Sequence, residues 1–410
     1  MLKREGLLAG VAVVDMGHVV AVPAAGRILS DWGADVVKVE PLSGEIFRGW
    51  TRNAGVDKLL QCKGGEVHYH FESLNTGKRA IALDLRQESG REILYKLIKK
   101  SDIFMSNYEM NVIKKLKVEY NTLRRFNPKL IYAFLTGYGS VGPDKDERGF
   151  DLSAGWARSG AQYMSALEPE GTPPPQRLGL IDMAASMNMI SGILAALYHR
   201  EKTGKGQELE LSLYHSAVWS TINDIQSALM GFPNSRINRT KQANPLVNIY
   251  RTRDNKWFQF NMSQSALQWP DFCRAIERPE LEEDPRFNDM LARERNCEEL
   301  IRIIDEVLAT KDRSDWRKRF KENNCICGLV QSPEEVVADA QALANDFFVE
   351  IDHPVAGRLK LVNTPVRFHQ NPALPKGPAP QIGQHTEEIL LELGYDWDDI
   401  VRLKDEKAIP

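Results

Sequence analysis

One aspartate stands out because of the apolar residues on both sides of it. Asp182 follows Leu180-Ile181 and precedes a long apolar segment, residues 184–198. That segment predicts a buried helix that begins close to Asp182. The position alone favours a helix cap, in which the carboxylate accepts backbone N–H groups. The alternative is a partly buried nucleophile, kept ionised by the helix dipole and shielded from water by apolar walls.

A glycine pattern offers a different chemistry. Gly137, Gly139 and Gly142 match the G-x-G-x-x-G pattern of dinucleotide-binding loops. That function needs a helix that opens at the third glycine, so that its N-terminus meets the pyrophosphate. Pro143 and a run of charged residues follow instead. The pattern therefore predicts a tight turn, and a nucleotide-binding oxidoreductase becomes a minor alternative.

Metal and hydrolase chemistry have little support in the sequence. His68 and His70 form one pair of candidate ligands, and Cys325 and Cys327 form another. A metal site needs three or four ligands, and neither pair has obvious partners. The G-x-S-x-G and H-E-x-x-H patterns are both missing from the sequence. We expect neither a metal site, nor a serine hydrolase, nor a zinc protease.

The elements that must position these residues alternate between strands and helices. Expected strands cover residues 11–14, 35–40, 80–85, 103–105, 130–135 and 207–213, and expected helices cover 23–32, 90–100, 112–126 and 184–198. The alternation predicts an α/β fold with an open, parallel, Rossmann-like sheet. Ligands of such sheets bind at the carboxyl ends of the strands.

The character of the sequence changes after about residue 225. A strand is expected at 257–261, and the charged segment 265–320 is mostly helical in pattern. We predict a large α/β domain over residues 1–225 and a smaller α+β domain over 226–335. Residues 336–410 are expected to return to the large domain, with a final helix at 385–393.

Composition limits the classes of partner. Lys and Arg number 53 and Asp and Glu number 56, so the net charge of −3 argues against nucleic-acid binding. Five cysteines in 410 residues do not form a disulfide framework. The N-terminus lacks a cleavage signal, and we expect no apolar stretch near the ~18 residues that a membrane span needs. These features predict a cytoplasmic protein without a membrane partner.

Taken together, the motifs resemble class III CoA-transferases, the formyl-CoA transferase and carnitine-CoA transferase type. The matching stretches lie at residues 32–40, 74–79, 137–143, 149–151, 193–207, 284–287 and 353–357. Each is weak alone, but the ordered set runs almost end to end. The resemblance implies that 1–225 is the CoA-binding domain and that the protein is an interlocked homodimer.

The resemblance also implies a mechanism. Asp182 matches the family's catalytic aspartate, which attacks an acyl-CoA to give a mixed anhydride and then an aspartyl-CoA thioester. The substrates are an acyl-CoA and a small carboxylic acid, with no prosthetic group. The implied CoA contacts are His18, Val20 and Ala21 near the thioester, Asn75, Lys78 and Arg79 at the phosphates, Asn107, Tyr108 and Lys115 at the adenosine, Gly137 and Tyr138 along the pantetheine, and Arg48 as the family's arginine.

Departures from the family pattern bear on the substrate. Val20 stands where formyl-CoA transferase has a glutamine, Thr136 replaces its lysine, and Pro41 replaces an arginine. Loss of these polar groups disfavours oxalate, a small dianion, and suits a larger monocarboxylate. Residues 22–27, 142–146, 244–245 and 344–346 look closest to the 2-hydroxyisocaproate and phenyllactate CoA-transferase branch. We therefore expect a 2-hydroxy acid acceptor.

Several alternatives stay open. Within the family, they are a carnitine/crotonobetaine, formyl-CoA/oxalate or bile-acid substrate pair. Within the superfamily, an acyl-CoA racemase would need a general base and acid that flank an α-carbon, and no His/Asp pair is clear in the sequence. A non-catalytic CoA-binding protein is the last alternative, and it would not depend on Asp182.

Overall fold

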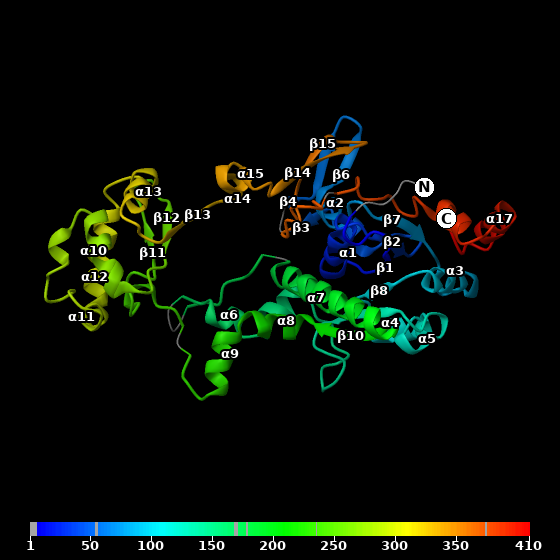
Figure 1. Cartoon of the computed structure of the whole chain (residues 1–410), viewed down its shortest axis with the longest axis horizontal. Helices are drawn as coiled ribbons and strands as arrows, with labels where there is room; N and C mark the ends of the chain where they lie inside the picture. The colour runs from blue at the N-terminus through cyan, green and yellow to red at the C-terminus, as the bar shows by residue number, and fades with distance from the viewer. Residues whose placement is uncertain (1–5, 54–55, 168–170, 178, 235, 374) are drawn as a thin grey trace. The chain divides into compact units, whose positions relative to one another are not determined.

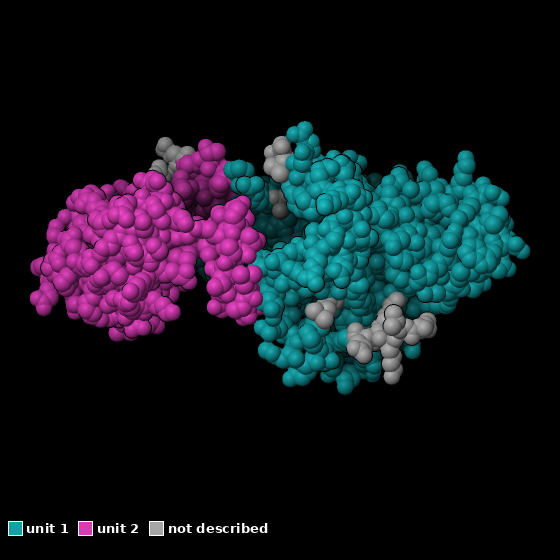
Figure 2. All heavy atoms as spheres, turned by 90° about the horizontal axis from the view of Figure 1, so that it is seen from above, with its two compact units in different colours: residues 1–161, 175–231, 346–410 teal, residues 162–174, 232–345 magenta. Residues whose placement is uncertain are grey.

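The computed structural model describes residues 6–53, 56–167, 171–177, 179–234, 236–373 and 375–410. The chain forms two compact units, shown in teal and magenta in Figure 2. Unit 1 comprises residues 1–161, 175–231 and 346–410, and unit 2 comprises 162–174 and 232–345. The predicted small domain, 226–335, thus differs from unit 2 at both ends and lacks the short segment 162–174.

Unit 1 is built on a six-stranded parallel sheet (Figure 1). Its strands, in spatial order, are β10 (Gln207–Ser212), β9 (Ile131–Thr136), β8 (Ile103–Ser106), β1 (Ala12–Met16), β2 (Asp35–Glu40) and β7 (Arg79–Ala82). The central strands are continuous apolar runs because both faces of the sheet are covered. Read from β7 to β10, the chain order is 3-2-1-4-5-6, that of a doubly wound Rossmann sheet. The predicted parallel α/β architecture is confirmed.

Alternate residues of each strand feed two separate cores. Val14 and Phe104 belong to a core covered by α3 (Glu88–Lys99), α5 (Tyr120–Phe126) and the C-terminal helices. Val13 and Ile103, their neighbours in sequence, belong to a second core covered by other helices. Those helices are α1 (Ala21–Asp31), α7 (Leu180–Thr203) and α8 (Leu213–Ser220). The period of two along each strand thus produces a three-layer unit.

Helix α7 carries Asp182 and is longer than the predicted 184–198 segment. It is also long and apolar enough to cross a membrane by length and composition, with a mean hydropathy of 1.6. The expectation that no apolar stretch reaches that length is therefore wrong. In the fold, Ala185, Met189 and Ile193 pack in the second core of unit 1. The apolar composition of α7 is thus explained, on its buried face, by packing against α1 and the sheet.

The helix predicted over 112–126 is two helices. The chain forms α4 (Met110–Lys115) and α5, and Lys117 between them has a φ of 58°. A residue in the left-handed region cannot continue a right-handed helix. The sequence pattern missed this break because apolar residues continue at helical spacing on both sides of it.

The remaining elements of the described chain are short or belong to unit 2. Between residues 46 and 241 they are η1 (Ile46–Gly49), β3 (Arg52–Asn53), β4 (Val56–Asp57), β5 (Leu59–Cys62), β6 (Gly65–His68), α2 (Tyr69–Asn75), the π-helix η2 (Asp151–Ala157), α6 (Ala161–Met164), α9 (Ile222–Leu229) and η3 (Arg239–Lys241). Of these, η3 and most of α6 belong to unit 2. Later in unit 1 they are β14 (Phe348–His353), β15 (Gly357–Val362), α16 (Thr386–Glu392) and α17 (Trp397–Asp405).

Unit 2 has its own antiparallel sheet and aromatic core. The sheet contains β11 (Ile249–Arg251), β12 (Trp257–Phe260) and β13 (Cys327–Val330). Its helical elements are α10 (Ser265–Ala275), η4 (Pro279–Leu281), α11 (Met290–Arg295), α12 (Cys297–Leu308), α13 (Arg313–Glu322), α14 (Pro333–Val337) and α15 (Ala340–Ala344). Phe260 and Phe320 make an edge-to-face contact at the centre of this core, with ring centroids 5.0 Å apart.

Candidate active site

The candidate site lies where the strand order of the sheet reverses. The chain adds strands outward from β1 on one side and from β8 on the other, so these neighbours form the switch point where open α/β sheets bind ligands. His18 follows β1 and Asn107 follows β8. The His18 N–H donates to Asn107 Oδ1 at 2.9 Å, and Asn107 Nδ2 donates to the His18 carbonyl at 3.0 Å. The two strand ends are thereby tied together.

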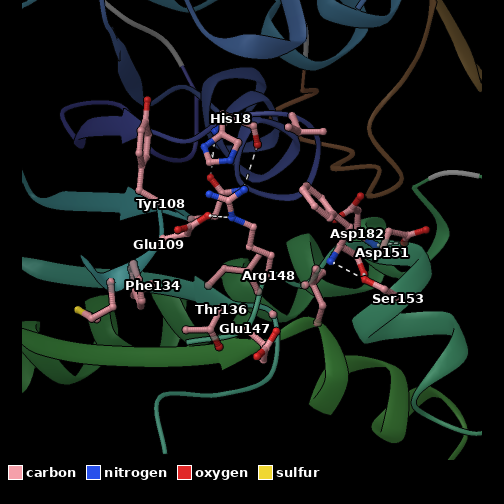
Figure 3. A pocket seen from close by; sticks show the side chains of 18 of the residues that line it. His18, Tyr108, Glu109, Phe134, Thr136, Glu147, Arg148, Asp151, Ser153 and Asp182 are labelled. Atoms are coloured by element: carbon pink, nitrogen blue, oxygen red, sulfur yellow. Dashed lines mark hydrogen bonds and ion pairs between the residues drawn. The ribbon is translucent and has the colours of Figure 1, made fainter. Parts of the chain in front are cut away.

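A cavity of about 570 Å³ opens at this point, within unit 1 (Figure 3). Its size is in the range of small-molecule and cofactor sites. Of the predicted site residues, those that line it are His18, Val20, Asn107, Tyr108, Gly137 and Asp182. The fold therefore brings predicted site residues from four separate parts of the chain into one cavity.

Asp182 lies in the first turn of α7 and is 7% exposed. The helix cap is Gly179, which has no side chain and a φ of 98°. The N-cap residue therefore makes no side-chain hydrogen bond to the backbone N–H groups of α7. The prediction that Asp182 caps its helix is wrong, and its carboxylate lines the cavity instead.

Asp151 supplies the missing cap from a distant part of the chain. Its Oδ1 accepts the backbone N–H groups of Ile181 at 2.7 Å and Asp182 at 2.9 Å, and its Oδ2 accepts that of Gly179 at 3.1 Å. The first N–H groups of a helix have no partner within it, so this buried carboxylate satisfies three of them. Asp151 thus frees the Asp182 carboxylate while it fixes the Asp182 backbone.

The surroundings of Asp182 make its carboxyl a weak acid. Burial and the neighbouring negative charge of Asp151 raise the pKa of Asp182 from 3.8 to about 7. A difference of this size corresponds to about 4 kcal/mol, whereas a helix N-terminus contributes about 0.3–1 kcal/mol to an exposed anion. Burial and Asp151 therefore oppose the ionisation that the sequence analysis attributed to the helix dipole.

The neighbouring aromatic groups are neutral near pH 7. His18 and Tyr108 meet edge to face with ring centroids 4.8 Å apart. Burial lowers the pKa of His18 and raises the pKa of Tyr108 to about 12. Both rings therefore offer uncharged hydrogen-bonding groups and apolar faces to a ligand.

Comparison with known proteins decides the class of protein. A family model described as CoA-transferase family III matches residues 8–386. The chain belongs to CoA-transferase family III. It is similar to an (R)-2-hydroxy-4-methylpentanoate CoA-transferase of Clostridioides difficile, with 33% identity over 98% of this chain and 99% of the relative. It is also 33% identical to a cinnamoyl-CoA:phenyllactate CoA-transferase of Clostridium sporogenes, over 100% of this chain and 98% of that one.

A solved structure has a similar fold. The crystal structure of Rv3272 from Mycobacterium tuberculosis is 29% identical, with a TM-score of 0.81 over 94% of this chain and 100% of that chain. The family and the relatives make this protein an enzyme, a CoA-transferase whose substrates are CoA thioesters.

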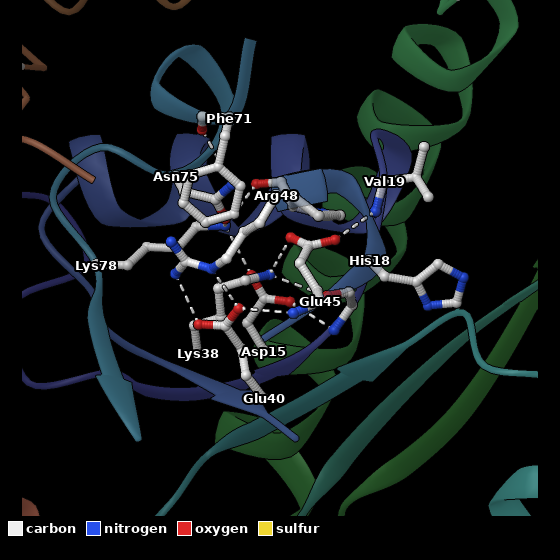
Figure 4. Close-up of polar contacts among 12 residues, drawn as sticks. Asp15, His18, Val19, Lys38, Glu40, Glu45, Arg48, Phe71, Asn75 and Lys78 are labelled. Atoms are coloured by element: carbon white, nitrogen blue, oxygen red, sulfur yellow. Dashed lines mark hydrogen bonds and ion pairs between the residues drawn. The ribbon is translucent and has the colours of Figure 1, made fainter. Parts of the chain in front are cut away.

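Several predicted CoA contacts of the family III enzyme lie outside the cavity lining. Lys78 is fully buried, and its Nζ donates to Asp15 Oδ2 at 2.7 Å, the Pro23 carbonyl at 2.8 Å and Asn75 Oδ1 at 2.8 Å (Figure 4). An ammonium group has three N–H donors, so Lys78 has none left for a phosphate. Asn75 is also buried, and its Nδ2 donates to the Phe71 carbonyl at 3.1 Å. Their contact with CoA stays a prediction.

The remaining predicted residues are also occupied or distant. The Arg79 guanidinium pairs with Asp35, Glu388 and Glu392, and the Arg48 guanidinium pairs with Glu40. Three predicted residues remain. Ala21 is buried in α1, and Lys115 is exposed on α4. The Arg158 guanidinium lies over the Tyr138 ring. The sequence showed which residues are charged or aromatic, but it did not show which partners they have. Their CoA contacts stay predictions as well.

The glycine pattern is a turn. After Gly137, the chain passes through Gly139 and Gly142, both with positive φ, and no helix begins at Gly142. A Cβ on Gly137 would lie 2.8 Å from the Cα of Gly149, so the loop's two ends touch through backbone. The helix that a dinucleotide-binding loop needs at its third glycine is thus not formed at Gly142, where the chain continues as an irregular loop.

Two groups on this loop and its neighbour were missed by the sequence analysis. Arg148 and Glu109 line the cavity and pair at 2.9 Å. Charged residues in a polar loop are usually solvated, so nothing in the sequence marked these.

Among the described residues, no group of three or more His, Cys, Asp or Glu side chains is arranged to hold a metal ion.

Proposed function

We propose that this enzyme moves CoA from an acyl-CoA to a carboxylic acid through covalent intermediates on Asp182. The observation that carries the proposal is a buried aspartate that lines the cavity while another carboxylate caps its helix. A carboxylate that capped the helix would be held against backbone N–H groups, which would direct it away from a substrate and make it less nucleophilic. Its high pKa indicates a carboxylate that is more basic than usual, and therefore a better nucleophile once ionised.

The proposed reaction has two symmetrical halves. The Asp182 carboxylate attacks the thioester carbonyl, a C–O bond forms, the C–S bond breaks, and CoA thiolate leaves a mixed anhydride. The thiolate then attacks the aspartyl carbonyl and releases the donor acid, which leaves an aspartyl-CoA thioester. The acceptor carboxylate reverses these steps and departs as the new acyl-CoA, so that Asp182 is restored. Atoms balance without an oxidant, a metal or a prosthetic group.

We propose a branched or aromatic 2-hydroxy acid as the acceptor. Support comes from the relatives, whose names specify 2-hydroxy-4-methylpentanoate and phenyllactate. The cavity wall includes Val20, Trp50 and Phe150. The Thr136 hydroxyl is used within the fold, because it donates to the Leu211 carbonyl and accepts the Gly139 N–H at 2.9 Å. These features suit an apolar monocarboxylate better than a dianion.

A thioester screen tests this function. Purified enzyme is incubated with acetyl-CoA, cinnamoyl-CoA or 2-hydroxyacyl-CoA donors and a panel of acids, and new thioesters are detected by mass. We expect new thioesters with 2-hydroxy-4-methylpentanoate and phenyllactate, and at least ~10-fold less with oxalate. Transfer to oxalate alone would contradict the substrate assignment. Uptake of solvent deuterium at the α-carbon without transfer would indicate a racemase.

We propose that the enzyme is a homodimer. Apolar side chains are exposed along α8 and α9, including Trp219, which is 63% exposed, and Leu229, which is 70% exposed. Neighbouring large apolar groups in solvent are typical of an interaction surface. Sedimentation equilibrium is expected to give twice the chain mass of 46.4 kDa, and a mass that stays at one chain at micromolar concentration would contradict the proposal.

We further propose a cytoplasmic location with no nucleic-acid or membrane partner. All five cysteines are free, as is usual in a reducing compartment. The net charge of −3 supplies no general attraction for phosphate backbones.

A further inference from the structure

A strained turn connects β1 to α1 and forms part of the cavity wall. The turn comprises residues 17–20, and Val19 within it has a φ of 66°. A β-branched residue in the left-handed region is a rare outlier, and such strain persists only where surrounding structure holds it. Val20 Cγ1 lies 3.8 Å from the place a Cβ on Gly179 would occupy. The turn therefore lies beside the start of the helix that carries Asp182.

A buried ion pair holds this turn from behind (Figure 4). Glu45 Oε2 accepts the Val19 N–H at 2.8 Å, and Lys38 Nζ donates to the Gly17 carbonyl at 2.9 Å. Lys38 Nζ and Glu45 Oε1 are themselves 2.8 Å apart. Since Asn107 holds both backbone groups of His18, side chains from other elements hold three successive residues of the turn.

The ion pair belongs to a balanced buried network. Three carboxylates, Asp15, Glu40 and Glu45, match three cations, Lys38, Lys78 and Arg48. The Glu45 backbone N–H donates to Glu40 Oε1 at 3.0 Å, which fixes Glu45 in turn. Burial of ion pairs adds little or nothing to stability compared with apolar packing. Lys38 and Glu45 do not line the cavity, so their hydrogen bonds reach the cavity wall through the backbone of the turn.

We propose that Glu45 is a positioning residue for the transfer reaction: with Lys38, it holds Val19 in the left-handed conformation and thereby fixes the cavity wall that lies beside the start of the Asp182 helix. The expected effect of Glu45 on the transfer rate rests on the proposed function. It also predicts a property of the turn that does not depend on any reaction. A wall displaced by about 1 Å can cost about 100-fold in rate.

The first test is backbone hydrogen exchange measured by mass spectrometry. Glu45→Gln keeps an acceptor for Val19 but removes the charge that holds Lys38. We expect amide exchange in residues 12–22 to accelerate at least ~10-fold, because the turn opens more often. Glu92→Gln, at an exposed position on α3, is the matched control. Unchanged exchange in Glu45→Gln would overturn the proposal.

A double-substitution test separates positioning from general folding. Glycine adopts positive φ without strain, so in a Val19→Gly background the turn needs no enforcement. We expect Glu45→Gln to lower kcat about 30-fold in the wild-type background and less than about 3-fold in the Val19→Gly background. An equal loss in both backgrounds would mean that Glu45 acts only on folding, and the proposal would fail.

Two further features keep the test decisive. If Glu45→Gln does not fold because Lys38 is left unpaired, the pair Lys38→Met with Glu45→Gln buries no lone charge and is expected to show the same faster exchange. If the wild-type enzyme transfers no CoA, the proposed function fails. The exchange result still stands or falls on its own.

Discussion

Replacement of Asp182 with Asn or Ala is expected to abolish CoA transfer. An amide of nearly the same shape cannot attack the thioester carbonyl, so no mixed anhydride forms, and we expect kcat to fall at least ~10³-fold. CoA binding should survive, because Asp182 is only one of the side chains that line a cavity of about 570 Å³. Steady-state transfer and calorimetric CoA titration measure the two effects separately.

Covalent trapping gives this prediction a second readout. With an acyl-CoA donor and hydroxylamine, the wild-type enzyme is expected to yield a hydroxamate at Asp182, detectable in a peptide digest. Asp182→Asn should yield none, and Asp398→Asn, at an exposed position on α17, should behave as wild type. Rapid transfer by Asp182→Asn would refute the nucleophile assignment and support a role for the cavity in binding alone.

Loss of activity in Asp182→Asn should come with a gain in stability, which excludes misfolding as its cause. Burial and Asp151 raise the pKa of Asp182 from 3.8 to about 7, so the folded state holds a proton that the unfolded state releases between these values. Wild-type stability therefore falls as pH rises from about 4 to 7. The amide removes that cost, so the variant should be more stable by about 2–4 kcal/mol at pH 8 and nearly equal at pH 4.

The fold was predictable where one local signal dominates. The central strands of the unit 1 sheet are mostly apolar, and segments of helical pattern separate them, so the parallel sheet followed from the sequence. The break between α4 and α5 was not predictable in this way. It depends on a positive φ at Lys117, and a lysine in the sequence does not indicate that conformation.

The candidate site was predictable in its residue types but not in its pairings. Asp182 was found because a charge between apolar segments is unusual. Its cap was not, because Asp151 lies 31 residues upstream and a sequence shows no contact between distant segments. The sequence did contain one indication of such a cap. Gly179 precedes an apolar helix and has no side chain, so another residue had to supply the cap. The ion pairs of Lys78 and Arg79 were not foreseen for the same reason, since their acidic partners are also distant in sequence.

Removal of Asp151 is expected to be the second most damaging change. Asp151→Ala leaves three backbone N–H groups at the start of α7 unpaired in a buried place. Each unsatisfied buried group costs about 1–3 kcal/mol, reduced where water enters. We expect kcat to fall at least ~100-fold, because Asp182 loses the bond that fixes its backbone, and the free energy of unfolding to fall by about 2–4 kcal/mol.

Asp151→Asn separates the charge of Asp151 from its role as a cap. The amide oxygen still accepts the N–H groups of Ile181 and Asp182, so the helix start is largely kept, while the negative charge is lost. That charge is the second cause, after burial, of the raised pKa of Asp182. The acid limb of kcat/KM against pH, expected near 7 in the wild type, should therefore move to lower pH. Asp398→Asn should leave the limb in place. If Asp151→Asn leaves it in place too, Asp151 is only a cap, and the acidity of Asp182 is set by burial alone.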